Sequence, residues 1–77
     1  MKAVDIEARI SAGLEGAQVS VETDDEHHYF VTVIWTGFEG MAPLARQRAV
    51  YATLGDAFAT GAVHALALKT WTPDQAK

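Results

Sequence analysis

Three histidines are the residues best suited to chemistry in this sequence, because imidazole nitrogens bind metal ions and exchange protons near neutral pH. His64 lies at the start of an apolar run, and His27 and His28 follow an acidic stretch at residues 24–26. His64 can act as a metal ligand or simply hydrogen-bond to backbone at the start of a strand. Because adjacent strand residues point to opposite faces, we expect at most one of the other two histidines to share a site with His64.

The absence of cysteine narrows the kind of metal site that this chain can form. It excludes disulfides, thiolate nucleophiles and cysteine-only metal sites. A site built by this chain alone would combine His64, one of the paired histidines and a carboxylate, and that set lacks the ligand spacing of known zinc motifs. The carboxylates of residues 24–26 favour the charged form of His27 and His28, which opposes metal binding at low pH. The alternative is that this pair consists of solvent-exposed histidines at the mouth of a hairpin.

Arg46 and Arg48 suggest a second kind of site, because they lie on the first helix of a pair similar to a helix–turn–helix. Residues two apart on a helix are separated by about 200°, so the two guanidinium groups flank the apolar face on opposite sides. Gln47 lies between them and is expected to face inward. Side-chain stems packed at the edge of the core account for both arginines without any ligand. A nucleic-acid site that uses them, with Lys69, is the alternative hypothesis.

Composition and charge limit the function classes. Ten acidic and six basic residues give a net charge of −4, which argues against strong phosphate binding. Neither serine lies in a nucleophile elbow, and no phosphate-binding glycine loop is present. Residues 37–40 are similar to a G-x-x-G loop, but Glu39 would repel a phosphate. We therefore expect a protein without enzymatic activity.

The length of 77 residues allows one domain, over residues 1–77. An apolar fraction of 49% and a charged fraction of 21% are typical of a globular protein. Acidic residues occur near the N-terminus before any apolar run develops, and no segment is long enough to span a bilayer. We expect a cytoplasmic protein with no membrane attachment.

Hydrophobic periodicity and turn residues predict six elements, and these must position the candidate side chains. Asp5 is the expected N-cap of the first helix, and Gly13 its expected end. In order, the elements are a helix over residues 5–13, strands over 17–23 and 28–35, a helix that begins at Pro43 and breaks at Gly55–Asp56, a short helix from Asp56 to Gly61, and a strand over 63–70.

These elements predict a two-layer α+β fold with a three-stranded mixed sheet and the helices on one face. The second strand is apolar on both faces, which is typical of a central strand. The first two strands form a hairpin, and the crossover through two helices makes the third strand parallel to the second. On the long helix, the residues expected to cluster on one face are Leu44, Val50, Tyr51 and Leu54.

Several motifs, taken together, resemble the BolA family over roughly residues 28–73. The family's pattern is F-x-G, then R-H-R-x-V-Y, then I-H-A-L and a closing T-P. The matching segments here are Phe38-Glu39-Gly40-Met41, Arg46-Gln47-Arg48 with Val50-Tyr51, Val63-His64-Ala65-Leu66, and Thr72-Pro73. The short loop before His28 and the Phe-x-Gly-Met phrase are similar to the short bacterial branch. The resemblance implies a class II KH-like fold with the order α-β-β-α-α-β.

The resemblance also implies a partner and a cofactor. Members of this family pair with monothiol glutaredoxins and share a [2Fe–2S] cluster, with thiolates from glutaredoxin and glutathione on one side. His64, in the I-H-A-L motif, is then the ligand from this chain, with His28 or His27 as a second ligand. Imidazole in place of thiolate on one iron raises the reduction potential. The chain alone is expected to bind no cofactor, and its function would be iron homeostasis or cluster transfer.

Two departures from the family pattern affect this expectation. Gln47 replaces the middle histidine of R-H-R, so that position offers no ligand. The tryptophan that usually follows T-P is absent, so a docking surface formed by the tail could be altered. Some members are also described as transcription regulators that bind DNA. The net charge and the separated arginines make that the weaker implication for this chain.

Overall fold

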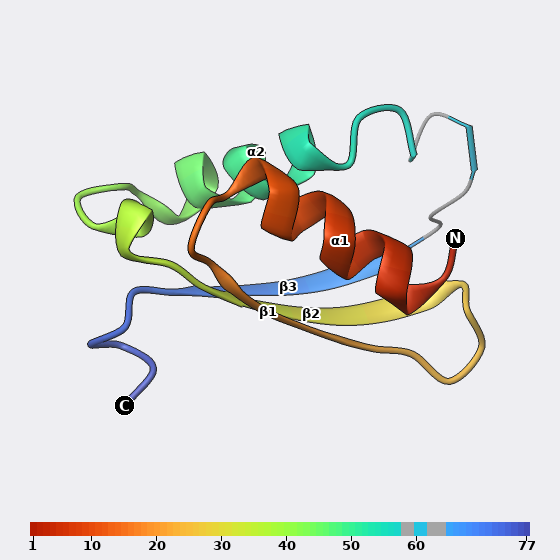
Figure 1. Ribbon diagram of the computed structural model, residues 1–77, viewed down its shortest axis with the longest axis horizontal. Coiled ribbons are helices and arrows are strands. Elements are labelled where there is room, and N and C mark those ends of the chain that lie inside the picture. The colour runs from red at the N-terminus through yellow and green to blue at the C-terminus, as the bar shows by residue number, and fades with distance from the viewer. Residues whose placement is uncertain (58–59, 62–64) are drawn as a thin grey trace.

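In the part of the chain that the structure describes, two α-helices pack on one face of a three-stranded sheet (Figure 1). The computed structural model describes residues 1–57, 60–61 and 65–77. The elements are α1 (Ala3–Gly13), β1 (Gln18–Glu22), β2 (His28–Ile34), the 3-10 helix η1 (Thr36–Phe38), α2 (Pro43–Thr53) and β3 (Ala65–Trp71). The expected short helix from Asp56 to Gly61 falls partly on residues 58–59, which lie outside the described residues. Its described residues form turns.

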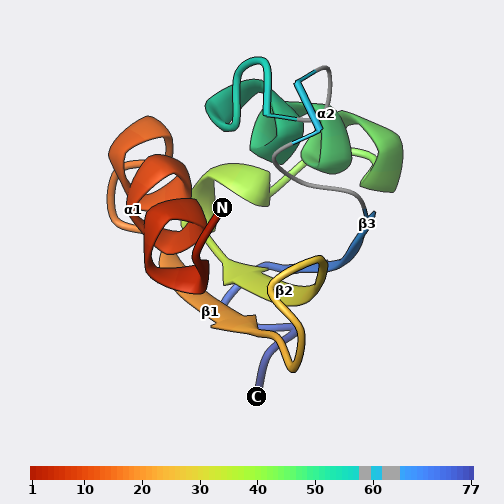
Figure 2. The same cartoon turned by 90° about the vertical axis from the view of Figure 1, so that its right-hand side faces the viewer.

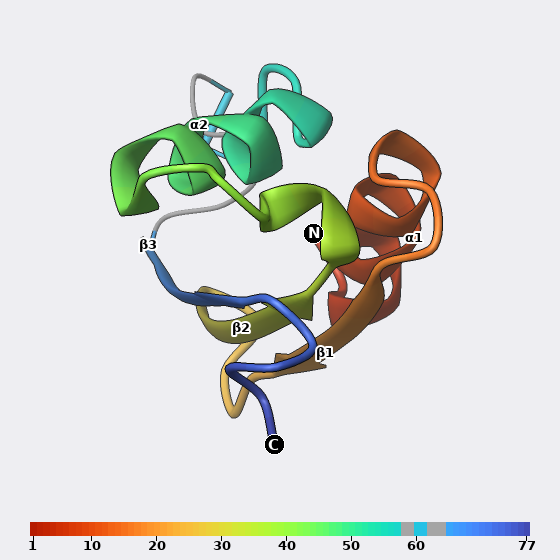
Figure 3. The same cartoon turned by 90° about the vertical axis from the view of Figure 1, so that its left-hand side faces the viewer.

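The sheet has the order β1-β2-β3, so β2 is the central strand as predicted. β1 pairs with β2 in antiparallel fashion, with Val21 opposite Val31. β3 runs parallel to β2, with Leu68 opposite Val31. The views from the two ends show both helices on the same side of the sheet (Figures 2 and 3). The predicted α+β topology is confirmed.

The core lies between the helices and one face of the sheet. Strand alternation turns Tyr29, Val31 and Val33 inward, where they meet Ile6 and Ile10 of α1. The opposite face of β2 is also apolar, yet none of the described helices covers it, and Phe30 is 60% exposed there. The apolar character of both faces therefore predicted the central position of β2 correctly, although only one of them is buried.

The start of α1 differs from the prediction. The helix begins at Ala3, with Lys2 before it and no side-chain cap. Asp5 lies in the first turn instead of capping the helix. A carboxylate there still interacts favourably with the positive end of the helix dipole. The helix ends at Gly13, as predicted. A side chain does not fit at this position, because a Cβ would lie 2.4 Å from Cγ2 of Thr53 on α2.

The buried face of α2 is shifted from the predicted one. Val50 and Leu54 are buried as expected, but Leu44 is 57% exposed. Tyr51 and Gln47 are also exposed, so the expectation that Gln47 faces inward is wrong. The observed inward stripe follows i, i+4 spacing through residues 46, 50 and 54. An arginine can occupy the half-buried position 46 because its Nε donates a hydrogen bond to the carbonyl of Met41.

Candidate functional site

The candidate metal ligands divide between described and undescribed parts of the chain. His28 is the first residue of β2, and its register partner is Ala65, the first residue of β3. His64 precedes Ala65 by one peptide bond in the sequence and lies outside the described residues. His27 is exposed and immediately precedes β2. The parallel pairing thus brings His28 opposite the residue that follows His64 in the chain.

Asp25 organises the backbone and the ring at the start of β2. Its Oδ1 accepts hydrogen bonds from the backbone N–H groups of His27 and His28, each at 2.9 Å. Its Oδ2 lies 2.8 Å from Nδ1 of His28. The bond from the backbone N–H of His28 has the largest effect, and together these contacts hold the pKa of the Asp25 carboxyl well below its usual range.

From the sequence, Asp25 is expected only to act as one of the three carboxylates of residues 24–26 near the histidines. The signal that could have identified its role is the spacing, because an aspartate often accepts hydrogen bonds from N–H groups two and three residues further on. Thr23 supports the same turn: its hydroxyl donates to the carbonyl of His28 at 2.7 Å and accepts from the N–H of Glu26 at 3.0 Å. The loop before β2 is therefore internally hydrogen-bonded.

Tyr29 fastens this loop to the core from the other face of β2. Its side chain is buried, and its hydroxyl lies 2.5 Å from the carbonyl oxygen of Glu26 and also contacts the carbonyl of Met1. Burial raises the pKa of the Tyr29 phenol, and the carboxylate of Glu26 raises it further. The phenol is thus held in its neutral, hydrogen-bond-donating form.

Tyr29→Phe is expected to destabilise the fold by about 1 kcal/mol at neutral pH through the lost hydrogen bond. The unfolded chain ionises tyrosine near pH ~10, whereas the folded chain keeps this proton to higher pH. Stability from Tyr29 is therefore complete below about pH 10 and is lost as pH rises through its folded pKa. Urea unfolding across the alkaline range should show a steeper loss for the wild type than for Tyr29→Phe. Parallel curves would contradict this role.

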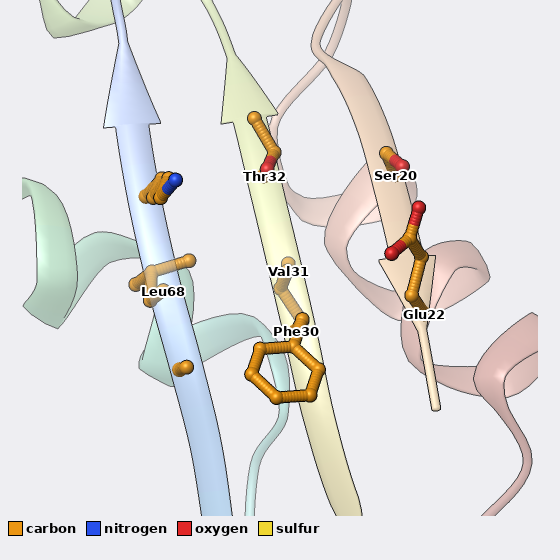
Figure 4. A pocket seen from close by; sticks show the side chains of 8 residues that line it. Ser20, Glu22, Phe30, Val31, Thr32 and Leu68 are labelled. Atoms are coloured by element: carbon orange, nitrogen blue, oxygen red, sulfur yellow. The ribbon is translucent and has the colours of Figure 1, made fainter. Parts of the chain in front are cut away.

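The surface around His28 is open and largely apolar. The His28 side chain is 65% exposed. It borders a hollow whose other lining residues are Tyr29, Phe30, Leu66 and Ala67. A second hollow lies further along the uncovered face of the sheet, where Phe30 and Thr32 of β2 project beside Ser20 and Glu22 of β1 (Figure 4). His28 therefore lies at one end of an uncovered, partly apolar sheet face.

His28 offers one nitrogen donor rather than a complete metal site. Across residues 1–57, 60–61 and 65–77, no three histidine, cysteine, aspartate or glutamate side chains form a group that could hold a metal ion. A site that uses His28 therefore needs donors from elsewhere: from His64, from a second molecule or from both.

The structure does not gather the candidate nucleic-acid residues into one patch. Arg46 is half-buried: its Nε donates to the carbonyl of Met41 at 3.0 Å, and its guanidinium lies 5.7 Å from the centre of the Phe38 ring. Arg48 is exposed on α2. Lys69 is exposed on β3 and lines the uncovered face of the sheet, away from the helices. The expectation of a stem packed at the core edge is confirmed for Arg46.

Within the part of the chain that the structure describes, neither helix has the length and apolar character needed to cross a membrane.

Comparison with known proteins identifies close relatives of this chain. A family model described as BolA-like protein matches residues 4–75. The structure of a BolA protein homologue from Coxiella burnetii superimposes with a TM-score of 0.84 at 40% identity, covering 99% of this chain and 96% of that one. This likeness confirms the fold class expected from the sequence.

Two curated relatives share shorter stretches. BolA-like protein 1 of Bos taurus is 45% identical over 58 residues, which make up 75% of this chain and 42% of that protein. The DNA-binding transcriptional regulator BolA of Vibrio cholerae is 41% identical over 56 residues, or 73% of this chain and 52% of that protein. The chain therefore spans about half of these proteins or less.

Proposed function

Because this chain belongs to the BolA family, we propose that it co-ligates a [2Fe–2S] cluster together with a monothiol glutaredoxin and its bound glutathione. The chain contributes His64 and His28, and the partner side contributes the thiolates that this cysteine-free sequence lacks. The protein acts without enzymatic activity of its own, in iron homeostasis or cluster transfer in the cytoplasm.

The observation that carries this proposal is the placement of His28. Its imidazole is exposed, it is anchored through Nδ1 to Asp25, and it lies opposite the residue that follows His64. Since Nδ1 faces a carboxylate, Nε2 is the nitrogen that can meet a metal ion. A nitrogen donor of this kind fits the iron of a cluster in which histidine replaces cysteine.

The surroundings of His28 support a site shared between two molecules. The described residues of this chain supply too few donors to complete a cluster. The apolar hollow formed with Phe30, Leu66 and Ala67 provides a surface on which a partner can exclude water from the metal. The cluster, when bound, supplies one-electron and iron-transfer chemistry, while this chain holds and orients imidazole.

His28 is favoured over His27 as the second ligand. The ring of His28 is fixed by the contact of its Nδ1 with Oδ2 of Asp25, and its strand position is defined by the pairing with Ala65. The backbone N–H of His27 also binds Asp25, but this residue precedes the strand. His27 is therefore the natural comparison in any test of His28.

The proposal is tested by reconstituting the chain with a monothiol glutaredoxin, glutathione, iron and sulfide. Visible circular dichroism is recorded for the wild type and for His64→Ala, His28→Ala and His27→Ala. We expect the first two variants to change the spectrum and the third to match the wild type. His28→Cys should retain a cluster at a lower reduction potential, because thiolate replaces imidazole on one iron. An unchanged spectrum in His64→Ala would overturn the assignment of that ligand.

DNA binding is the second candidate function, because the Vibrio cholerae relative carries that description. The residues that would serve it are Arg48 and Lys69, since the guanidinium of Arg46 is engaged within the fold. Binding to duplex DNA is measured against salt concentration, where contacts with phosphates give a steep decrease in affinity. The absence of salt-dependent binding at low ionic strength would dismiss this function.

A further inference from the structure

The turn that precedes β2 contains a feature that the metal hypothesis does not by itself require. Asp25 makes three contacts with His28, the first residue of β2, and with His27, the residue before it. Two go to backbone N–H groups through Oδ1, and one goes to the His28 ring through Oδ2. The two oxygens of one carboxylate thus have separate tasks, one fixing the backbone and the other meeting the imidazole.

The contact with the ring determines which nitrogen carries the proton. A carboxylate oxygen only accepts hydrogen bonds, so Nδ1 of His28 must be the donor at 2.8 Å. In neutral imidazole the other nitrogen, Nε2, is then left with its lone pair. The ring is 65% exposed, so this lone pair is open to a ligand from outside the chain.

We propose that Asp25 is the positioning residue for His28: it holds the ring in the Nδ1–H tautomer and presents Nε2 to the shared metal. This inference rests on the proposed function. Carboxylate–histidine–metal arrangements of this kind fix the ring orientation and increase the basicity of the ligand. Thr23 strengthens the arrangement by closing the same turn through the carbonyl of His28.

Asp25→Asn provides the sharpest variant, because the chain needs only one of the two Asp25 oxygens to hold the turn. Asparagine keeps an oxygen for the two backbone N–H groups and places an NH2 group opposite Nδ1. That NH2 group donates, so Nδ1 becomes the acceptor and the proton moves to Nε2. Asp24→Asn is the matched control, since it makes the same chemical change one residue earlier in the same loop.

The first measurement uses the isolated full chain with no metal. Nitrogen-15 NMR of the His28 ring is recorded under conditions in which the ring signals are those of neutral imidazole. We expect Nδ1 to be the protonated nitrogen in the wild type and in Asp24→Asn, and Nε2 in Asp25→Asn. A wild-type ring protonated on Nε2, or no exchange of the two signals in Asp25→Asn, would overturn the positioning role whatever the fate of the cluster.

The second measurement uses the reconstituted complex with glutaredoxin and glutathione. Substitution of a residue that hydrogen-bonds to a metal ligand typically lowers metal affinity by about 10–100-fold. The concentration of iron chelator that removes half of the cluster should therefore be lower by about tenfold or more in Asp25→Asn. It should stay unchanged in Asp24→Asn. If His28→Ala holds the cluster as firmly as the wild type, the positioning role is overturned. If the first measurement nevertheless gives the expected tautomers, the contact between Asp25 and His28 stands and the assignment of His28 as a metal ligand is the part that fails.

Discussion

Phe38→Ala is expected to destabilise the protein by about 3–5 kcal/mol, the usual cost of emptying a large buried aromatic site. Phe38 is fully buried, packs edge-on against Trp35 with the ring centres 5.2 Å apart, and supports the guanidinium of Arg46. A domain of 77 residues has about 4–12 kcal/mol of total stability, so much of it depends on this ring. Thermal unfolding followed by circular dichroism should show a midpoint lower by more than about 12 °C.

Phe30→Ala is the matched control for this prediction. It removes the same phenyl group from a position that is 60% exposed on the uncovered face of the sheet. Exposed substitutions usually change stability by no more than about 0.5 kcal/mol, so the two variants should differ severalfold. Equal losses in Phe38→Ala and Phe30→Ala would contradict the placement of the core on the helical face alone.

Arg46→Ala is expected to cost about 2–3 kcal/mol and to loosen the C-terminal tail. The guanidinium donates to the carbonyl of Met41 at 3.0 Å, to Oε1 of Gln75 at 2.8 Å and more weakly to the carbonyl of Thr70 at 3.4 Å. Hydrogen bonds from a charged donor are worth about 1.5–3 kcal/mol, and a cation over an aromatic ring adds about 0.5–2 kcal/mol. The hydrogen bonds and the contact with the aromatic ring involve the same guanidinium group, so their contributions to stability do not add in full.

Two readouts separate this structural role from a role in ligand binding. Urea unfolding gives the loss of stability, and amide hydrogen exchange should accelerate at Thr72, Gln75 and Ala76, whose hydrogen bonds close the tail turn. Arg48→Ala is the control and should leave both measurements unchanged, because this residue is exposed on α2. Unchanged tail exchange in Arg46→Ala would refute the tail-anchoring role.

Part of the BolA sequence pattern is therefore explained by the packing of the fold. Phe38 fills the core, and Gly40 adopts a φ of 79°, a conformation that favours glycine. The turn then brings the carbonyl of Met41 to Arg46. The F-x-G-M phrase and the first arginine of the R-x-R phrase are explained by these contacts alone. The hypothesis of function rests instead on the histidines.

The elements that could be predicted are those with a clear pattern of apolar residues or an unambiguous connection. Apolar residues on both faces of residues 28–35 predicted the central strand, and the two-helix connection predicted the parallel pairing of β2 with β3. The rotation of α2 about its axis could not be predicted. The sequence predicts only that the stem of Arg46 packs at the edge of the core. Its contacts with Phe38, Met41 and Gln75 are what make a half-buried guanidinium favourable in the inward stripe of α2.

The sequence by itself determined the types of donor available: three histidines, no cysteine, and a net charge of −4. Residue type fixes what chemistry a side chain can perform, so this chain without cysteine cannot supply the thiolates of an iron–sulfur cluster by itself. Only the tertiary structure decided which groups meet. The sheet places His28 opposite Ala65, on two strands that are far apart in the chain. The turn before β2 places the carboxylate of Asp25 against the ring of His28. Hydrogen bonds depend on ångström-scale placement, which residue spacing alone does not specify.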